Sequence, residues 1–244
     1  MINSLGLDDD LDSVELVRLV ELAFDIRIAN EEAEAITNVG ELYDVLLKKI
    51  PRDETNRKCA SAMAFYRLRR ALVDLRSGDK LAPQFDMAPW RSVHAKPFFR
   101  QIGERTGLNM PRPVFSWIGK TGGWIALAWL IAAIVDFALS IMHRAVPDSL
   151  SFFCWSALPA AYLLAQFDPG RLPKDCSTLG VLAKKVAILS YGKLVKSGAD
   201  TSDSAIWKAM LDVLSSFNGF PADQITGETL FLESQLRKAA KVAA

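Results

Sequence analysis

Two long runs of apolar residues lie in the middle of the chain and contrast with the mixed pattern elsewhere. The first, WIALAWLIAAIVDFALSIM at residues 124–142, is apolar except for Asp136 and Ser140. With the two preceding glycines it makes a helix of about 30 Å, the thickness of the hydrocarbon core of a bilayer. Its nine Leu, Ile, Val and Phe residues favour insertion by about 4 kcal/mol, against about 3 kcal/mol opposing it from one central aspartate. The run therefore predicts a membrane-spanning helix.

A second apolar run follows after the short segment HRAVPDS. It is LSFFCWSALPAAYLLAQF at residues 150–167, in which Pro159 is expected to kink the helix without preventing insertion. Two such runs so close together favour a transmembrane helical hairpin over residues 122–167, although a buried hairpin of a soluble protein has the same pattern. In the membrane hairpin, Asp136 is expected to contact a polar group of the partner helix or of a second subunit.

Basic residues are distributed unequally around the predicted hairpin. Three precede the first run and four follow the second, whereas only Arg144 lies between the two runs. The flanking residues are Arg105, Arg112, Lys120, Arg171, Lys174, Lys184 and Lys185. Because basic residues stay on the cytoplasmic side, we expect an integral membrane protein with both termini cytoplasmic, in the inner membrane if the source is bacterial.

The segments on either side of the hairpin show apolar residues at helical spacing, so the fold class is predicted to be mainly α. In residues 1–54 the pattern predicts a helix capped by Asp12 or Ser13, a short helix over residues 30–36 capped by Asn30, and a third helix that Pro51 ends. The predicted buried stripe of the first helix is Val14, Val17, Leu19, Val20 and Phe24.

Two further segments complete the predicted organisation. Residues 55–121 contain a basic helix, RKCASAMAFYRLRRALVDL, and a Pro-rich juxtamembrane region with a short helix near residues 98–104. Residues 168–244 contain a helix capped by Asp203 or Ser204 and stopped by Gly219. Its predicted buried stripe is Ile206, Met210, Val213, Leu214 and Phe217.

Charge is separated along the chain although the formal net charge is only +1. Residues 1–54 hold 14 acidic and 5 basic side chains, a net charge of −9, and residues 55–121 hold 13 basic and 4 acidic, a net charge of +9. This separation predicts either docking of the basic helix on the acidic head or contact of that helix with anionic lipid. Nucleic acid is not an expected partner, because no nucleic-acid-binding motif accompanies the basic charge.

The acidic segment carries a longer pattern, DDLDSVELVRLVELAFDIRIANEEAEAITNVGELYDVL. It resembles the second to fourth helices of the acyl carrier protein family, without a gap from Asp9 to about Leu46. The resemblance places Asp10 where the family has the serine that carries 4'-phosphopantetheine. A carboxylate cannot form the stable phosphodiester that this cofactor needs, so the resemblance implies a carrier-like fold without a cofactor. Ser13, in the rival register D-S-V-E-L, is the alternative attachment site.

The C-terminal sequence DSAIWKAMLDVLSSFNGFPADQITGETLFLE resembles the first helix and following loop of an acyl carrier protein. That first helix does not precede Asp9, so the two segments supply complementary parts. We expect the C-terminal helix to complete a permuted carrier-like bundle; the alternative is a true first helix encoded upstream of the given start. The resemblance also implies that Asp10, Asp12, Glu15 and Glu21 present an acidic helix to a partner, such as an acyl-handling enzyme with a basic surface.

Catalysis is not predicted. His143 and Asp148 form an H-x-x-x-x-D pattern like that of membrane acyltransferases, but they fall in the outward-facing turn and no F-P-E-G segment accompanies them. No nucleotide-binding loop or metalloprotease motif occurs, and the three cysteines form no C-x-x-C pair. The sequence thus predicts a membrane-anchored, non-enzymatic interaction module. A carrier modified at Ser13, an acyltransferase using His143 and Asp148, and a scaffold without carrier partners are the alternatives.

Overall fold

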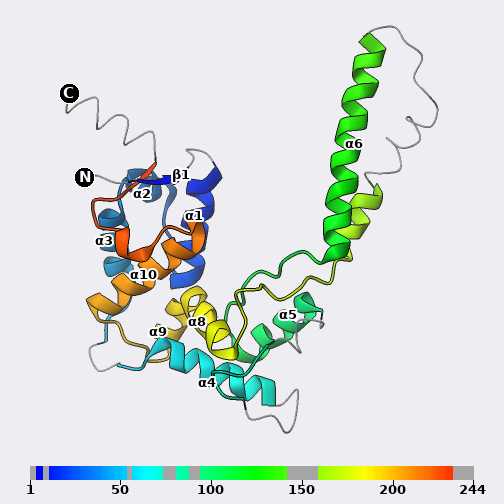
Figure 1. Cartoon of the computed structure of the whole chain (residues 1–244). Helices are drawn as coiled ribbons and strands as arrows, with labels where there is room; N and C mark the ends of the chain where they lie inside the picture. Colours follow the sequence, from blue (N-terminus) through cyan, green and yellow to red (C-terminus); the bar gives the residue numbers. More distant parts are fainter. Residues whose placement is uncertain are drawn as a thin grey trace, which may run out of the picture. The chain divides into compact units, whose positions relative to one another are not determined.

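The computed structural model describes residues 4–7, 11–53, 57–73, 81–87, 94–141 and 159–232, and these residues are mainly helical (Figure 1). The chain divides into two compact units. The first takes in the described residues of 1–85, 102–111 and 178–244, and the second takes in those of 86–101 and 112–177. The acidic N-terminal helices and the C-terminal helix therefore belong to the same unit.

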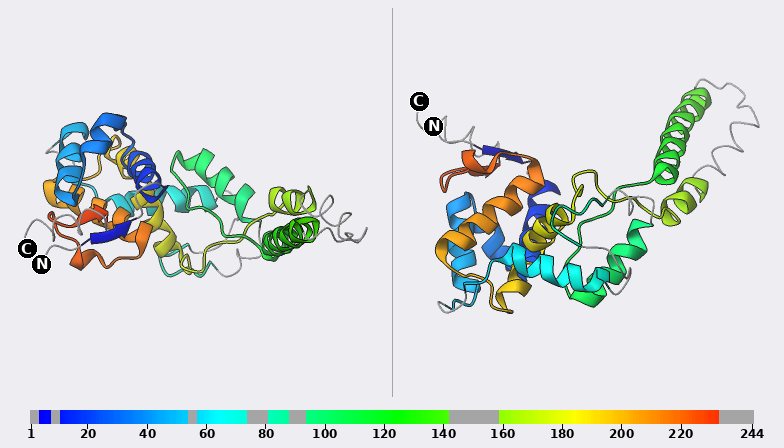
Figure 2. Two further views of the ribbon diagram at one scale, coloured as in Figure 1. Left: turned by 90° about the horizontal axis from the view of Figure 1, so that it is seen from above. Right: turned by 60° about the horizontal axis from the view of Figure 1, so that its bottom comes forward.

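The first unit contains four helices from opposite ends of the chain. α1 (Leu11–Phe24), α2 (Asn30–Ala35) and α3 (Val39–Lys49) come from the N-terminal segment, and α10 (Asp203–Asn218) comes from the C-terminal segment. α10 packs against both α1 and α3, and the views in Figures 1 and 2 agree on this arrangement. Buried residues on these helices include Leu16, Val20, Phe24, Leu42, Leu46, Ile206, Met210, Val213 and Leu214.

The same unit pairs the two ends of the described chain directly. β1 (Ser4–Leu7) and β2 (Leu230–Leu232) form a parallel pair, with Ser4 opposite Leu230 and Leu7 opposite Leu232. A 3-10 helix, η2 (Ala222–Gln224), lies between α10 and β2. Chain segments more than two hundred residues apart in sequence are thus adjacent in space.

Three more helices fill the first unit between these ends. α4 (Ala60–Val73), α8 (Leu179–Leu189) and α9 (Tyr191–Val195) pack on one another, and α8 also contacts α1 and α10. The buried side of α8 consists of Leu179, Leu182, Ala183, Val186 and Ala187. The apolar core of this unit therefore extends beyond α1, α2, α3 and α10 to α4, α8 and α9, which the sequence places between α3 and α10.

The buried side of α1 differs from the predicted stripe. Val14 was expected to be buried, but 51% of its surface is exposed, whereas Leu16 and Val20 are buried. Val14 lies about 200° from Leu16 around the helix, so the two residues cannot share a face. The contacts of α1 with α8, α9 and α10 select the face that carries Leu16 and Val20.

Backbone geometry at the helix starts also corrects two predicted caps. The Ser202 hydroxyl accepts a hydrogen bond from the Ala205 backbone N–H at 3.4 Å, so Ser202 caps α10 instead of Asp203 or Ser204. Ala29 occupies the cap position of α2, because Asn30 is already helical. The predicted stop of α10 is confirmed: Gly219 has a left-handed φ of 73°.

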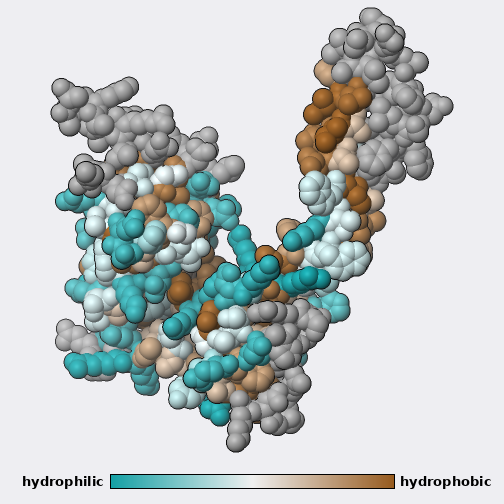
Figure 3. All heavy atoms as spheres, in the orientation of Figure 1, coloured by the Kyte–Doolittle hydropathy of each residue, from teal (hydrophilic) through white to brown (hydrophobic). Residues whose placement is uncertain are grey.

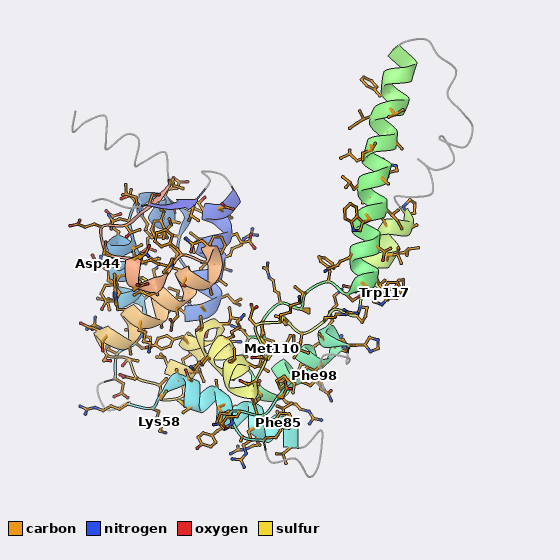
Figure 4. All side chains as sticks on the ribbon, viewed as in Figure 1. Asp44, Lys58, Phe85, Phe98, Met110 and Trp117 are labelled. Atoms are coloured by element: carbon orange, nitrogen blue, oxygen red, sulfur yellow. The ribbon has the colours of Figure 1, made fainter. Side chains whose placement is uncertain are left out.

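The second unit contains α6 (Trp117–Ile141) and the first part of α5 (Ala95–Thr106), which matches the helix expected near residues 98–104. Figure 4 shows Phe98 on α5 and Trp117 at the beginning of α6. The Ser116 backbone N–H and hydroxyl both donate to the buried Asp168 carboxylate at this point. Burial by itself would raise the pKa of Asp168, but hydrogen bonds from Ser116 and Gly170 outweigh it and lower the pKa.

Among the described residues, α6 contains one span that is long and apolar enough to cross a membrane, Trp117–Val135. Only 11% of that span is buried, and Figure 3 shows apolar side chains gathered over α6. Of the second predicted run, residues 150–158 lie outside the described residues and residues 159–166 are helical. The structure therefore provides one candidate span in place of the predicted pair.

Candidate functional site

The exposed side of α1 combines apolar and charged residues. Val14, Arg18 and Leu22 follow one another at four-residue spacing, and Val14 and Leu22 are each about half exposed. Glu15, beside Val14, is also exposed. We refer to Val14, Glu15, Arg18 and Leu22 as the α1 face. Two exposed apolar side chains aligned on one side of the helix, with charges beside them, make this face a candidate surface for binding another protein.

The predicted acidic residues of α1 have different surroundings. Asp12 is half-buried and Glu15 is exposed. One carboxylate oxygen of Glu21 accepts a hydrogen bond from the Ile28 backbone N–H at 2.7 Å. Glu21 therefore helps to hold the turn between α1 and α2, where Asp25 adopts a left-handed φ of 54°. Of the predicted acidic residues that the structure describes, Glu15 is the most accessible to a partner.

The start of α3 is held by the C-terminal loop that the sequence resemblance singled out. The backbone N–H groups of Val39 and Gly40 donate to the carbonyl oxygens of Thr229 and Gly227, at 3.0 Å and 2.9 Å. The Phe231 N–H donates to the Thr37 carbonyl at 3.2 Å. The first N–H groups of a helix have no acceptor within the helix. The carbonyl oxygens of this loop therefore provide the hydrogen-bond acceptors for the first N–H groups of α3.

Glu41 adds a local cap at the same place. Its carboxylate accepts hydrogen bonds from the backbone N–H and the hydroxyl of Thr37, at 2.6 Å and 2.9 Å, and Asn38 Oδ1 accepts from the Glu41 N–H at 3.0 Å. Bonds from the Thr37 backbone are the largest cause of the lowered pKa of Glu41. This reciprocal arrangement fixes the end of α3 against which the C-terminal loop packs.

Residues 191–196, in and directly after α9, cover the C-terminal end of α1. A Cβ atom built on Gly192 of α9 would lie only 1.8 Å from the Phe24 carbonyl oxygen, so glycine is required for this contact. The rings of Phe24 and Tyr191 meet edge to face, with 5.5 Å between their centroids. Lys196 pairs with Asp25. This end of α1 is therefore enclosed within the unit, which leaves the α1 face as its accessible side.

Asn109 joins three helices at the same end. Its side-chain amide donates to the carbonyl oxygens of Leu22 on α1 and Leu189 on α8, at 3.1 Å and 2.7 Å. Its Oδ1 accepts a hydrogen bond from Lys193 Nζ at 2.8 Å. The sequence did not predict a role for Asn109 or Gly192, because only the fold brings these residues to α1. A glycine within a helical segment was the one sequence feature that pointed to a close contact at position 192.

Several predicted site residues lie outside the described residues. They are Asp10, the rival catalytic pair His143 and Asp148, and the side chain of Asp136. Ser13 is described and half-buried as the third residue of α1. Within the part of the chain that the structure describes, no group of three or more His, Cys, Asp or Glu residues is arranged to hold a metal ion.

Comparison with known proteins identifies similarity to acyl carrier proteins. A segment of 48 residues, 20% of this chain, is 46% identical to the acyl carrier protein of Syntrophobacter fumaroxidans and covers 58% of it. The acyl carrier proteins of two strains of Buchnera aphidicola subsp. Acyrthosiphon pisum, Tuc7 and APS, are 48% identical over 48 residues and are covered to 59%. The chain thus spans less than two thirds of the length of these relatives. No family model matches the chain. No solved structure matches it either.

The chain therefore contains an acyl-carrier-protein-like segment within a mainly helical protein. The similarity covers a fifth of the chain, so it describes this segment and not the remainder.

Proposed function

We propose that this protein is a membrane-anchored, non-enzymatic interaction module that presents a carrier-like helical bundle, without phosphopantetheine, to a cytoplasmic partner. The observation that carries the proposal is the packing of α10, whose sequence resembles the first helix of a carrier, on α1 and α3 of the carrier-like segment. α1, α2 and α3 supply the second to fourth helices, and α10 with the loop at residues 225–231 supplies the first helix and its loop.

Three kinds of contact support this permuted bundle. α10 packs on α1 and α3, and the rings of Tyr43 and Trp207 meet edge to face across α3 and α10 at 5.0 Å. The Tyr43 hydroxyl donates to the Asp203 carbonyl at 3.0 Å. β1 and β2 pair in parallel, which joins the two sequence ends. On this proposal, the residues between α3 and α10 are an insertion into a single carrier-like bundle.

The lack of phosphopantetheine follows from Asp10. A carboxylate at the attachment position would give an acyl phosphate, which hydrolyses, instead of a stable phosphodiester. A carrier-like bundle without its cofactor retains the surface by which carriers are recognised. The α1 face, with exposed Val14 and Leu22 beside Glu15, supports binding to a partner protein. The acidic net charge of residues 1–54 and the carrier resemblance favour an acyl-handling enzyme with a basic surface as that partner.

Membrane anchoring rests on the character of α6. Two common reasons for an apolar helix do not apply here: α6 is mostly exposed, so it is not a core helix, and it lies in the middle of the sequence, so it is not a leader. A Cβ on Gly122 would approach the Ala161 carbonyl oxygen and Leu164 Cβ to 3.2 Å, so α6 and the helix at residues 159–166 are in close contact. That contact is one that a hairpin over residues 122–167 requires. The distribution of basic residues supports placing both termini in the cytoplasm.

Exposed aromatic residues near the beginning of α6 support the same proposal. Trp117, Trp124, Tyr162 and Phe167 are each at least 65% exposed, and all belong to the second unit. Tryptophan and tyrosine are enriched where a membrane helix meets water. These residues therefore fit the cytoplasmic boundary of the proposed hairpin.

Intact mass measurement tests the carrier-like part. The wild type, Ser13→Ala and Asp10→Ser are each co-expressed with a broad-specificity phosphopantetheinyl transferase. We expect no mass gain for the wild type and a gain of one phosphopantetheine arm for Asp10→Ser, because that change restores the hydroxyl. A gain in the wild type that Ser13→Ala abolishes would show a functional carrier instead.

The partner and the anchor need separate measurements. A photo-crosslinking residue placed at Leu22 in native membranes should capture an acyl-handling enzyme, and the same residue at Glu31 on α2 is the control. Replacing Glu15 with lysine should weaken that capture.

Membrane anchoring is tested by extraction. Release of the intact protein from membranes by alkaline carbonate would refute the anchor. Acyltransferase activity lost on His143→Ala would favour an enzyme.

A further inference from the structure

α4 has one buried side and one basic side. Its buried residues are Ala64, Leu68, Ala71 and Leu72, on the side that packs against α8 and α9. Arg69 and Arg70 are exposed and Arg67 is half-buried, next to the exposed ring of Tyr66. The basic side chains of α4 therefore remain accessible to solvent on the side that does not pack against α8 and α9.

Two of these arginines meet a third across a cleft of the first unit. Arg67 and Arg70, one turn apart on α4, line a cleft of about 390 Å³ together with Arg105 at the end of α5. Ala71 and Thr106 complete the lining. We call this the arginine cleft. Arg69, the neighbour of Arg70 in sequence, is not part of its lining.

Among the described residues, no acidic side chain lines the arginine cleft. The Thr106 hydroxyl donates to the Ile102 carbonyl at 2.7 Å and accepts from the Leu108 N–H at 3.3 Å, so its bonds are made within the fold. None of the ion pairs between described residues includes Arg67, Arg70 or Arg105. Three like charges converging on one cavity repel one another, and an anion in the cavity removes that repulsion.

The favourable effect of positive charge at a helix C-terminus accounts for only two of the three arginines of the cleft. Arg70 and Arg105 lie in the last turns of α4 and α5, where a positive charge is favourable. Arg67 lies one turn earlier and still lines the same cleft. Planar guanidinium groups form paired hydrogen bonds to phosphate oxygens, and a cleft of this size holds a phosphate or diphosphate group.

We propose that the arginine cleft is a binding site for a phosphate-bearing anion, held by Arg67, Arg70 and Arg105. Ala71 contributes a small side chain that keeps the cavity open, and it is itself buried. The phosphate could belong to a free metabolite or to the headgroup of an anionic phospholipid, since both present the same oxygens. This site is independent of the α1 face and of the proposed carrier-like function.

Calorimetric titration of the full-length protein in phosphatidylcholine nanodiscs tests the site, with inorganic pyrophosphate as the probe. Arg70→Gln and Arg69→Gln form a matched pair, because they remove the same charge from adjacent positions and only Arg70 lines the cleft. We expect saturable binding that Arg70→Gln weakens by about tenfold or more, as for the loss of a charge-assisted hydrogen bond. Arg69→Gln should change the affinity by less than about threefold, through long-range charge alone.

A second arm distinguishes the source of the phosphate. Nanodiscs that contain phosphatidic acid should weaken pyrophosphate binding through competition if a lipid headgroup occupies the cleft, and should leave it unchanged if the ligand is free in solution. Circular dichroism melts of each variant establish folding. Absence of saturable binding, or equal losses for Arg69→Gln and Arg70→Gln, would overturn the proposal. Arg67→Lys keeps the charge but loses the paired hydrogen-bond geometry, so we expect it to bind pyrophosphate more weakly than the wild type does.

Discussion

Replacing Gly192 with alanine should disrupt the contact between α9 and the end of α1. The added Cβ would lie 1.8 Å from the Phe24 carbonyl oxygen, 2.1 Å from its carbon and 2.8 Å from the Asp25 nitrogen. All three are backbone atoms, so no flexible side chain can move aside. A normal contact requires α9 to shift by more than an ångström, which would separate the rings of Phe24 and Tyr191 and the pair between Lys196 and Asp25.

The expected cost can be set against a gain in helix propensity. Overpacking of a close contact costs about 1–3 kcal/mol or more, and the lost aromatic pair adds about 1 kcal/mol. Alanine is more favourable than glycine inside a helix by about 1 kcal/mol. Since the last two terms cancel, we expect Gly192→Ala to lower the free energy of unfolding of the first unit by about 1–3 kcal/mol.

Gly103→Ala on α5 is the matched control. Its added Cβ would meet its nearest neighbour, the Leu108 carbonyl oxygen, at 3.4 Å, which is close to an ordinary contact. This variant should be neutral or slightly stabilising. Urea unfolding followed by far-ultraviolet circular dichroism, with hydrogen exchange of α1, provides the measurement. Equal stability of the two variants would refute the close packing of α9 on α1, and with it the conclusion that the α1 face is the accessible side of this helix.

Three further perturbations test other parts of the fold. Asn109→Ala leaves two carbonyl groups at helix ends without their donor, and should cost about 1–3 kcal/mol in urea unfolding. Burial raises the pKa of Asp212, more than the nearby lysines lower it, so the ionised carboxylate is disfavoured in the folded state. Stability is then lost as the pH rises from the unfolded pKa through the folded one, and Asp212→Asn should raise Tm at pH 7 but not at pH 3. Gly122→Leu should loosen the contact of α6 with residues 159–166 and lower Tm in detergent, whereas Gly123→Leu, whose Cβ would meet nothing within 4 Å, should not.

The ends of the helices could be predicted in part from the sequence. Gly219 ends α10 as expected, because a left-handed residue after an apolar stripe is a local property of the chain. The cap of α10 moved by one residue, to Ser202, because Asp203 and Ser204 are already inside the helix. Neighbouring polar residues compete for a cap, and backbone geometry selects among them.

The exposed side of α1 was not predictable in the same way. Its sequence has apolar residues on more than one side, including Val14, Leu16 and Leu22, so periodicity alone allows several buried stripes. Packing against α8, α9 and α10 buries Leu16 and leaves Val14 and Leu22 exposed. The candidate partner surface therefore depends on helices that lie far away in the sequence.

The sequence by itself determined the mainly helical class, the carrier-like segment and the apolar character of α6, because periodicity, composition and short residue patterns are local properties. The sequence resemblance also predicted that the C-terminal helix packs with the N-terminal helices. Only the tertiary structure decided which side of α1 is buried, that the loop at residues 225–231 completes the start of α3, and that three arginines line one cleft. These features depend on contacts between residues that the chain separates by tens to hundreds of positions, and no local pattern encodes such distances.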